Sequence, residues 1–216
     1  MKPNENLLVK IGNDIIDILW AGILWLILSL PVVAIGSASC ALYYTVVKVV
    51  RRKRETVIRA FFCSFWQNLW QGIAVTFIYI VWTGMIIVII RGYQKAAVDF
   101  LNDYVVMTLL VMMGVPLLFT IVYIIPIISR FSLNLRRQFQ LALMLSIHHL
   151  PITIYLVLLM GLAVLILYRF TFWIFVVPGF FALISSFIIE RILLDYIKKE
   201  RDRFGHIDEE AWYMEE

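Results

Sequence analysis

The chain has 216 residues, of which 62% are apolar and 16% are charged, and its formal net charge is +4 at pH 7. Soluble domains are about 45–50% apolar and about 25% charged, so a soluble protein of this composition could not cover its surface and lipid must surround much of the chain. The positive charge does not indicate nucleic-acid binding, because basic residues beside membrane spans follow the positive-inside bias.

The first seventeen residues mix charged residues with apolar ones at helical spacing, which predicts an amphipathic lead-in helix. A stretch of thirty uncharged residues follows, Ile18 to Val47. A helix of that length is about 45 Å long, whereas the hydrocarbon core is about 30 Å thick. Pro31 disfavours helix at the residue before it. We therefore predict a hairpin, with a first helix ending near Ser29 or Leu30, a turn from Pro31 to Gly36, and a return helix from Ser37.

Small residues occupy the start of this return helix. Gly36, Ser37, Ala38, Ser39 and Ala41 are suited to close packing against a neighbouring helix, in this chain or in another.

A basic block at 51–54 follows, and Glu55 to Gln71 is predicted to form a second amphipathic helix. Trp66 and Trp70 on this helix are typical of the headgroup level of a membrane. The predicted apolar stripe of the helix comprises Ile58, Phe61, Phe62, Phe65 and Leu69.

The remaining chain alternates long uncharged runs with polar connectors. Pro116 and Pro126 lie inside the second of these runs and predict a kink. The predicted spans are Ile73–Ile90, Tyr104–Ser129, Leu150–Tyr168 and Phe170–Ile189, and a third amphipathic helix is predicted over Leu135–His149.

These elements predict an all-α polytopic membrane helical bundle of about six transmembrane helices in three hairpins, with five spans as the alternative and with cytoplasmic amphipathic connector helices. Residues 1–204 form the single transmembrane domain, and the acidic tail, 205–216, is expected to be flexible. With six spans, sixteen lysines and arginines lie on one side of the membrane and three on the other. The positive-inside rule then places both termini in the cytoplasm, and the C-terminus stays there with five spans.

The residues with reactive side chains do not form a recognisable catalytic pattern, and we expect no enzyme activity, catalytic residue, metal or cofactor. His148 and His149 are adjacent, so their side chains point about 100° apart on a helix, whereas a metal-binding pair prefers spacing i, i+4. No predicted span has an ionisable residue near its centre. Glu190 and Arg191 lie deepest, about a turn from the cytoplasmic exit, and we expect Arg191 to pair with Asp195 on the same helix.

Three segments of the chain resemble the YesL-like family of bacterial integral membrane proteins. The first is Leu30-Pro31 followed by Ile35-Gly36-x-Ala38-x-x-Ala41-Leu42-Tyr43-Tyr44. The others are Phe61-x-x-x-Phe65-x-x-Asn68, and Ser129-Arg130-Phe131-Ser132 leading to His149-Leu150-Pro151. The family often has an asparagine in the helix before Leu-Pro, where this chain reads Gln138-Phe-Gln140-Leu-Ala, so a role that depends on this asparagine is not expected.

This resemblance implies a multispan protein of the bacterial plasma membrane that is often encoded near carbohydrate ABC-transporter genes. We therefore expect a non-catalytic protein that is accessory to, or regulates, such a transporter. The expected partners are the lipid bilayer and permease or ATPase subunits, or a second copy of this chain, and not nucleic acid. The candidate helix-packing or partner-contact residues are Pro31, Gly36, Ala38, Ala41, Tyr43, Phe61, Phe65, Asn68, Arg130, His149 and Pro151.

The alternative function is an independent small-solute transporter or channel. Two observations favour it: the weak threefold repeat of an amphipathic helix followed by a hairpin, and the prolines of the span Tyr104–Ser129.

Overall fold

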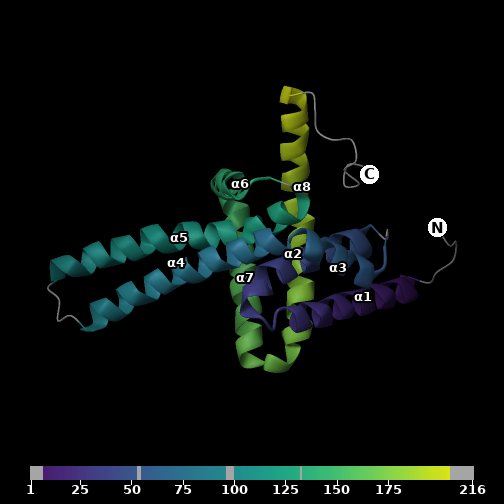
Figure 1. The fold of residues 1–216 in the computed structure, drawn as a ribbon, viewed down its shortest axis with the longest axis horizontal. Coiled ribbons are helices and arrows are strands. Elements are labelled where there is room, and N and C mark those ends of the chain that lie inside the picture. Colours follow the sequence, from purple (N-terminus) through teal and green to yellow (C-terminus); the bar gives the residue numbers. More distant parts are fainter. Residues whose placement is uncertain (1–6, 53–54, 96–99, 132, 205–216) are drawn as a thin grey trace.

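The computed structural model describes residues 7–52, 55–95, 100–131 and 133–204, and these residues form helices and turns with no strand among them (Figure 1). The predicted acidic tail lies outside the described residues. Three short segments, labelled η, are 3₁₀-helices (η1, η3) or a π-helix (η2). The elements in order are α1 (Leu7–Leu28), η1 (Val32–Ala34), α2 (Ile35–Thr45), η2 (Val46–Arg51), α3 (Val57–Gln67), α4 (Leu69–Lys95), α5 (Phe100–Arg130), α6 (Leu135–His148), α7 (Leu150–Arg169), η3 (Thr171–Phe175) and α8 (Val177–Phe204).

Five helical segments in the described part of the chain are long and apolar enough to cross a membrane, which identifies an all-helical membrane protein. They are Val32–Arg51, Leu69–Tyr93, Tyr104–Arg130, Leu150–Arg169 and Val177–Tyr196. The predicted lead-in and first span form one continuous helix, α1, which is not among these five, so the sixth span stays a prediction.

The first hairpin turns earlier than its sequence predicts. Helix α1 ends at Leu28, and a helical conformation resumes at Val32, immediately after Pro31. Proline fits the start of a helix because its missing N–H would have no partner in the first turn. The predicted turn from Pro31 to Gly36 is therefore wrong at its C-terminal end, since Gly36 lies inside α2.

Helix α2 and its continuation η2 lie at the centre of the fold, with α1, α3, α4, α5 and α8 around them. Of the residues in this segment, 61% are buried, compared with 6% for the α4 span and 11% for the α5 span. Most of the buried side chains of α2 are small, which allows its neighbours to approach closely. All the buried residues of α2 are Ser37, Ala38, Cys40, Ala41, Leu42, Tyr43 and Thr45.

The contact between α2 and α4 depends on two glycines. A Cβ atom at Gly36 would collide with the carbonyl oxygen of Gly72, and one at Gly72 would collide with the backbone of Ser37. The Gly36 N–H donates to Thr76 Oγ1 at 2.9 Å, and the Ser37 hydroxyl donates to the Leu69 carbonyl at 3.0 Å. Hydrogen bonds between a backbone group of one helix and a hydroxyl group of the other therefore reinforce this crossing.

Two connector helices each end at a single polar residue before a span begins. The predicted helix Glu55–Gln71 is divided at Asn68, whose side-chain amide donates to the Ser64 carbonyl at 3.0 Å. The predicted helix Leu135–His149 is observed as α6, and the chain bends at His149. Thr153 at the start of α7 donates to the His149 carbonyl at 3.0 Å.

Two long hairpins leave the centre in different directions (Figure 1). Helices α4 and α5 extend side by side to one side, whereas α7 and the N-terminal part of α8 extend to another. Helix α4 has 27 residues and α5 has 31, and α5 continues through Pro116 and Pro126. At about 1.5 Å per residue both exceed the bilayer core of about 30 Å, so both can cross it when strongly tilted.

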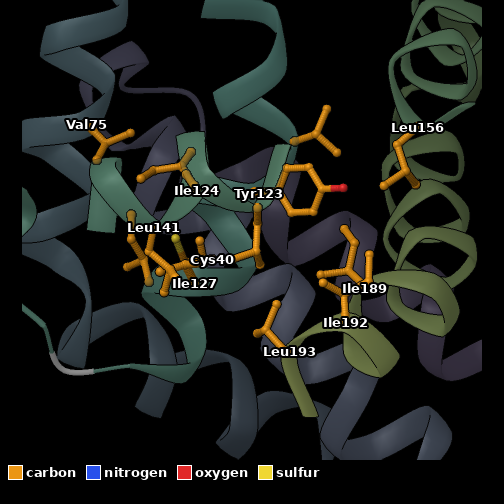
Figure 2. Packing of buried hydrophobic residues seen from close by; sticks show 14 residues of the cluster. Cys40, Val75, Tyr123, Ile124, Ile127, Leu141, Leu156, Ile189, Ile192 and Leu193 are labelled. Atoms are coloured by element: carbon orange, nitrogen blue, oxygen red, sulfur yellow. The ribbon is translucent and has the colours of Figure 1, made fainter. Parts of the chain in front are cut away.

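A second group of buried side chains joins α5 to α6, α7 and α8 (Figure 2). Tyr123, Ile124 and Ile127 of α5 are fully buried in it, together with Leu156 of α7 and Ile189 of α8. The Tyr123 hydroxyl forms a hydrogen bond of 3.1 Å with Thr153 Oγ1. This core fixes the base of both hairpins relative to α2.

The glycine crossing predicts the effect of one methyl group. Gly36→Ala should lower the free energy of unfolding by about 1–3 kcal/mol, because the added Cβ forces two backbones apart. Gly161→Ala on α7 is the matched control, since nothing lies within 4 Å of its Cβ position, and it should be neutral or stabilising by about 0.5–1 kcal/mol. Thermal unfolding in detergent measures both. Equal melting temperatures for the two variants would contradict the close contact.

Candidate functional site

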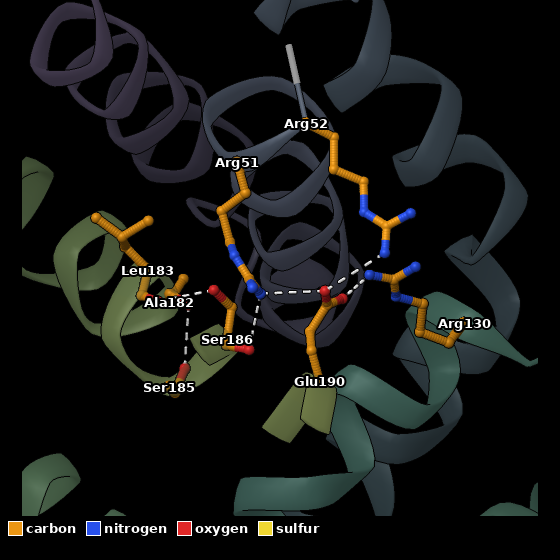
Figure 3. Close-up of polar contacts among 8 residues, drawn as sticks. All are labelled: Arg51, Arg52, Arg130, Ala182, Leu183, Ser185, Ser186 and Glu190. Carbon is orange, nitrogen blue, oxygen red and sulfur yellow. Dashed lines mark hydrogen bonds and ion pairs between the residues drawn. The ribbon is translucent and has the colours of Figure 1, made fainter. Parts of the chain in front are cut away.

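A buried carboxylate binds three guanidinium groups near the ends of η2 and α5 (Figure 3). Glu190 of α8 contacts Arg51 at 3.1 Å, Arg52 at 4.0 Å, and Arg130. The Glu190 and Arg130 side chains are only 6% and 4% exposed. We call these four residues the arginine cluster.

Further contacts hold Arg51 in place. Its guanidinium donates to the Ser186 carbonyl at 3.0 Å and lies over the Phe187 ring, 4.5 Å from the ring centroid. Both partners are on α8, so Arg51 connects the end of the central segment to the helix that carries Glu190. Arginine suits such a position because its planar group combines ion pairing, hydrogen bonding and stacking.

The arginine cluster carries more positive than negative charge among its four side chains. Burying even a paired charge is costly, and an unpaired one costs several kcal/mol more. Glu190 therefore has a structural role as the counter-charge that lets three arginines lie together.

Sequence reasoning singled out Glu190 but did not find its partners. The ion pairs that the structure describes on α8 run through Glu190, and not through the expected pair of Arg191 with Asp195. Arg51 and Glu190 are 139 residues apart in the chain. The sequence did contain a signal: Glu190 is an acidic residue at the end of an apolar run, and two other apolar runs end near Arg51 and Arg130.

The structure divides the eleven predicted contact residues into three groups. Ala38, Ala41 and Tyr43 of α2, together with Phe61 and Phe65 of α3, are buried between elements of this chain. Gly36 lies in the crossing with α4, and Arg130 lies in the arginine cluster. The residues at helix junctions are Pro31, Asn68, His149 and Pro151.

Helix α3 has two apolar sides, where the sequence predicted one. Its buried side includes Ser64, which is not part of the predicted stripe, because α2 packs there. Ile58 and Phe62 of the predicted stripe point outward with Trp66, which is 67% exposed. An outward apolar side that ends in tryptophan is typical of a helix at the membrane interface.

A hydrogen-bonded pair of glutamines was not predicted. Gln138 of α6 is fully buried and donates to the side-chain oxygen of Gln71 at 2.9 Å. The Gln138 amide also lies 3.3 Å from the Phe131 carbonyl. Gln138 lies in the region where the chain departs from the YesL-like pattern, and here it connects the start of α4 to α6.

Metal chemistry has no evident centre in the part of the chain that the structure describes. No group of three or more His, Cys, Asp or Glu side chains there is placed to hold a metal ion. The rings of His148 and His149 stack, with centroids 4.8 Å apart.

The arginine cluster predicts a stability defect for Glu190→Gln. Neutralising Glu190 removes its ion pairs with the buried Arg130 and with Arg51 and should lower the free energy of unfolding by about 3–5 kcal/mol. Asp195→Asn, an exposed acid on the same helix, should change it by less than about 0.5 kcal/mol. Unfolding in mixed micelles measures both, and Arg130→Met should partly restore the Glu190→Gln variant. A Glu190→Gln protein as stable as the Asp195→Asn protein would show that Glu190 is not the counter-charge.

Comparison with known proteins gives one match. No curated protein and no solved structure shows significant similarity to the chain. Residues 18–89 match the family described as "Protein of unknown function, DUF624". This match covers the end of α1, the central α2–η2 segment, α3 and most of α4, so the chain is similar to DUF624 proteins over the part that contains the glycine crossing.

Proposed function

We propose that the protein is a non-catalytic bacterial plasma-membrane protein that acts by binding another integral membrane protein, the permease of a carbohydrate ABC importer. Its role would be accessory or regulatory. The observation that carries the proposal is the α4–α5 hairpin, which extends beyond the core with most of its surface uncovered (Figure 1).

The hairpin offers a place where a partner helix can approach its backbone. Nothing lies within 4 Å of the position of a Cβ atom at Gly84 of α4, in contrast to the crowded Gly36 and Gly72. Gly84 lines a mainly apolar cavity of about 540 Å³ between α2, α4 and α5. Small residues are the usual contact points between helices in lipid, because they allow close approach and backbone contact.

A transmembrane helix is the partner whose chemistry fits this surface. The side chains around the hairpin are apolar, so they suit a partner that is itself in lipid. The direction of the hairpin, away from α7 and α8, leaves room for a second protein beside it (Figure 1). The resemblance to YesL-like proteins then favours a carbohydrate permease over other membrane proteins.

The orientation of the chain supports contact with the cytoplasmic side of an importer. We propose that the basic connectors, and with them both termini, face the cytoplasm, because sixteen of the nineteen lysines and arginines lie on that side when six spans are counted. Helix α3 would then lie at the inner membrane surface, with Trp66 and Trp70 at the headgroups. An ATPase subunit bound below the permease would lie on the same side.

The alternative, an independent transporter or channel, ranks second. Three cavities in the described part of the chain have almost entirely apolar linings, which give a sugar or an ion few polar groups to bind. Flux of a sugar or an ion through liposomes that contain only the purified protein would favour this alternative.

The adaptor function predicts a specific loss of partner binding. Gly84→Leu should reduce recovery of permease and ATPase subunits with the tagged protein by about tenfold or more, because a large side chain blocks the approach of a helix. Gly161→Leu places the same side chain at an equally open position on α7 and should leave recovery unchanged. Affinity purification from native membranes with mass spectrometry measures both. Wild-type protein recovered without any transporter subunit would contradict the proposal.

A further inference from the structure

The outward side of α6 combines exposed arginines with exposed apolar side chains. Arg136 and Arg137 are exposed at its start. Leu143, Met144 and Ile147 follow, and they are 40%, 56% and 58% exposed. Positions seven and eleven apart recur on one side of an α-helix, so these five residues form one continuous surface, which we call the outward α6 stripe. The opposite side of α6 is buried in the core that it shares with α5, α7 and α8.

The two arginines of the stripe have no charged partner among the described residues. The ion pairs of these residues join other side chains, and the first turn of α6 contains no acid. Arginine forms its strongest hydrogen bonds with carboxylates, often two at a time. The outward α6 stripe therefore suits a partner that presents carboxylates next to apolar side chains.

A peptide fits this stripe better than a bilayer surface does. A helix that lies in the membrane interface has its apolar side turned to the lipid and its charged side turned to water. On α6 the exposed arginines and the exposed apolar residues share one side, and protein covers the other. Lipid would therefore cover both kinds of residue together, whereas a peptide can place an acid at each arginine.

The chain itself contains a segment with this chemistry, the acidic tail 205–216, which lies outside the described residues. Five of its twelve residues are acidic and none is lysine or arginine, and its acids flank Trp212, Tyr213 and Met214. Acidic terminal segments are often interaction segments. Tryptophan, tyrosine and methionine are enriched in protein contacts because they bury large apolar areas.

The end of α8 is close enough to α6 for the acidic tail to reach it. Leu193 of α8 belongs to the same core cluster as Leu141 and Leu145 of α6, and both helices lie in the upper part of Figure 1. From Leu193 to Phe204 the helix rises about 16 Å. Twelve extended residues span about 40 Å, so the tail is long enough to fold back along α8 and cross α6.

We propose that the acidic tail binds the outward α6 stripe of its own chain. The carboxylates at 208–210 pair with Arg136 and Arg137, and Trp212 and Tyr213 cover the apolar part of the stripe. A segment on a short tether has an effective concentration in the millimolar range, so weak contacts suffice. The tail then acts as an internal cover that another protein must displace to reach α6. This contact does not involve the α4–α5 hairpin, so it stands or falls independently of the partner proposed there.

Alkylation of one introduced cysteine tests the contact. Gln140 is exposed between the arginines and the apolar residues of the stripe. Gln140→Cys is compared in the full-length chain and in a chain shortened to Phe204, each in lipid nanodiscs that hold one copy, with a hydrophilic maleimide. The shortened chain should react at least about fivefold faster, because the tethered tail covers the stripe most of the time. The buried Cys40 must stay unmodified in both chains, which shows that the shortened chain keeps the fold.

The other outcomes contradict the proposal in distinguishable ways. If Gln140→Cys reacts slowly in both chains, compared with the exposed Cys63, the bilayer covers the stripe. If it reacts as fast as Cys63 in both chains, nothing covers the stripe.

Charge variants test whether the arginines hold the tail. Arg136→Gln with Arg137→Gln should lower the ratio of the two alkylation rates, shortened chain over full-length chain, to below about twofold, because the tail loses its ion pairs. The ratio cancels the direct effect of the arginines on the thiol. Arg91→Gln with Arg169→Gln is the matched control, since both arginines are exposed on other helices, and it should leave the ratio unchanged. An unchanged ratio in the Arg136 and Arg137 variant would overturn the proposed contact.

Discussion

The fold depends on the close approach of two backbones, where Gly36 of α2 meets Gly72 of α4. In lipid, apolar side chains gain little by leaving the solvent, so helix association relies on van der Waals packing and hydrogen bonds between helices. The glycine crossing supplies both, and it allows α2 and η2 to lie enclosed by five other helices. The same contact sets where the α4–α5 hairpin leaves the core, and hence which surface is free for another protein.

Charge at the end of the central segment adds a second constraint. Three arginines from η2 and α5 lie around Glu190, so the last helix is held to the first hairpin and to the second at one point. A buried charge is costly, and it is tolerated here because it is paired.

Local patterns in the sequence predicted most helices, because uncharged runs, prolines and amphipathic spacing act over a few residues. Helix α6 begins at the predicted residue, and α5 and α7 differ from prediction by a few residues at their ends. The crossing of Gly36 with Gly72, the partners of Glu190 and the buried Gln71–Gln138 pair could not be predicted, since each joins distant segments. The inward side of α3 was mispredicted for the same reason, because Ser64 is buried by α2 and not by its own helix.

The two native cysteines test the central position of α2 most directly. Cys40 is fully buried on α2, whereas Cys63 is exposed on the outward side of α3. Alkylation of native membranes with N-ethylmaleimide, followed by peptide mass spectrometry, should modify Cys63 and leave Cys40 unmodified until the protein is unfolded in SDS. Modification of Cys40 at the same rate as Cys63 in the native membrane would contradict an enclosed α2 and the fold built around it.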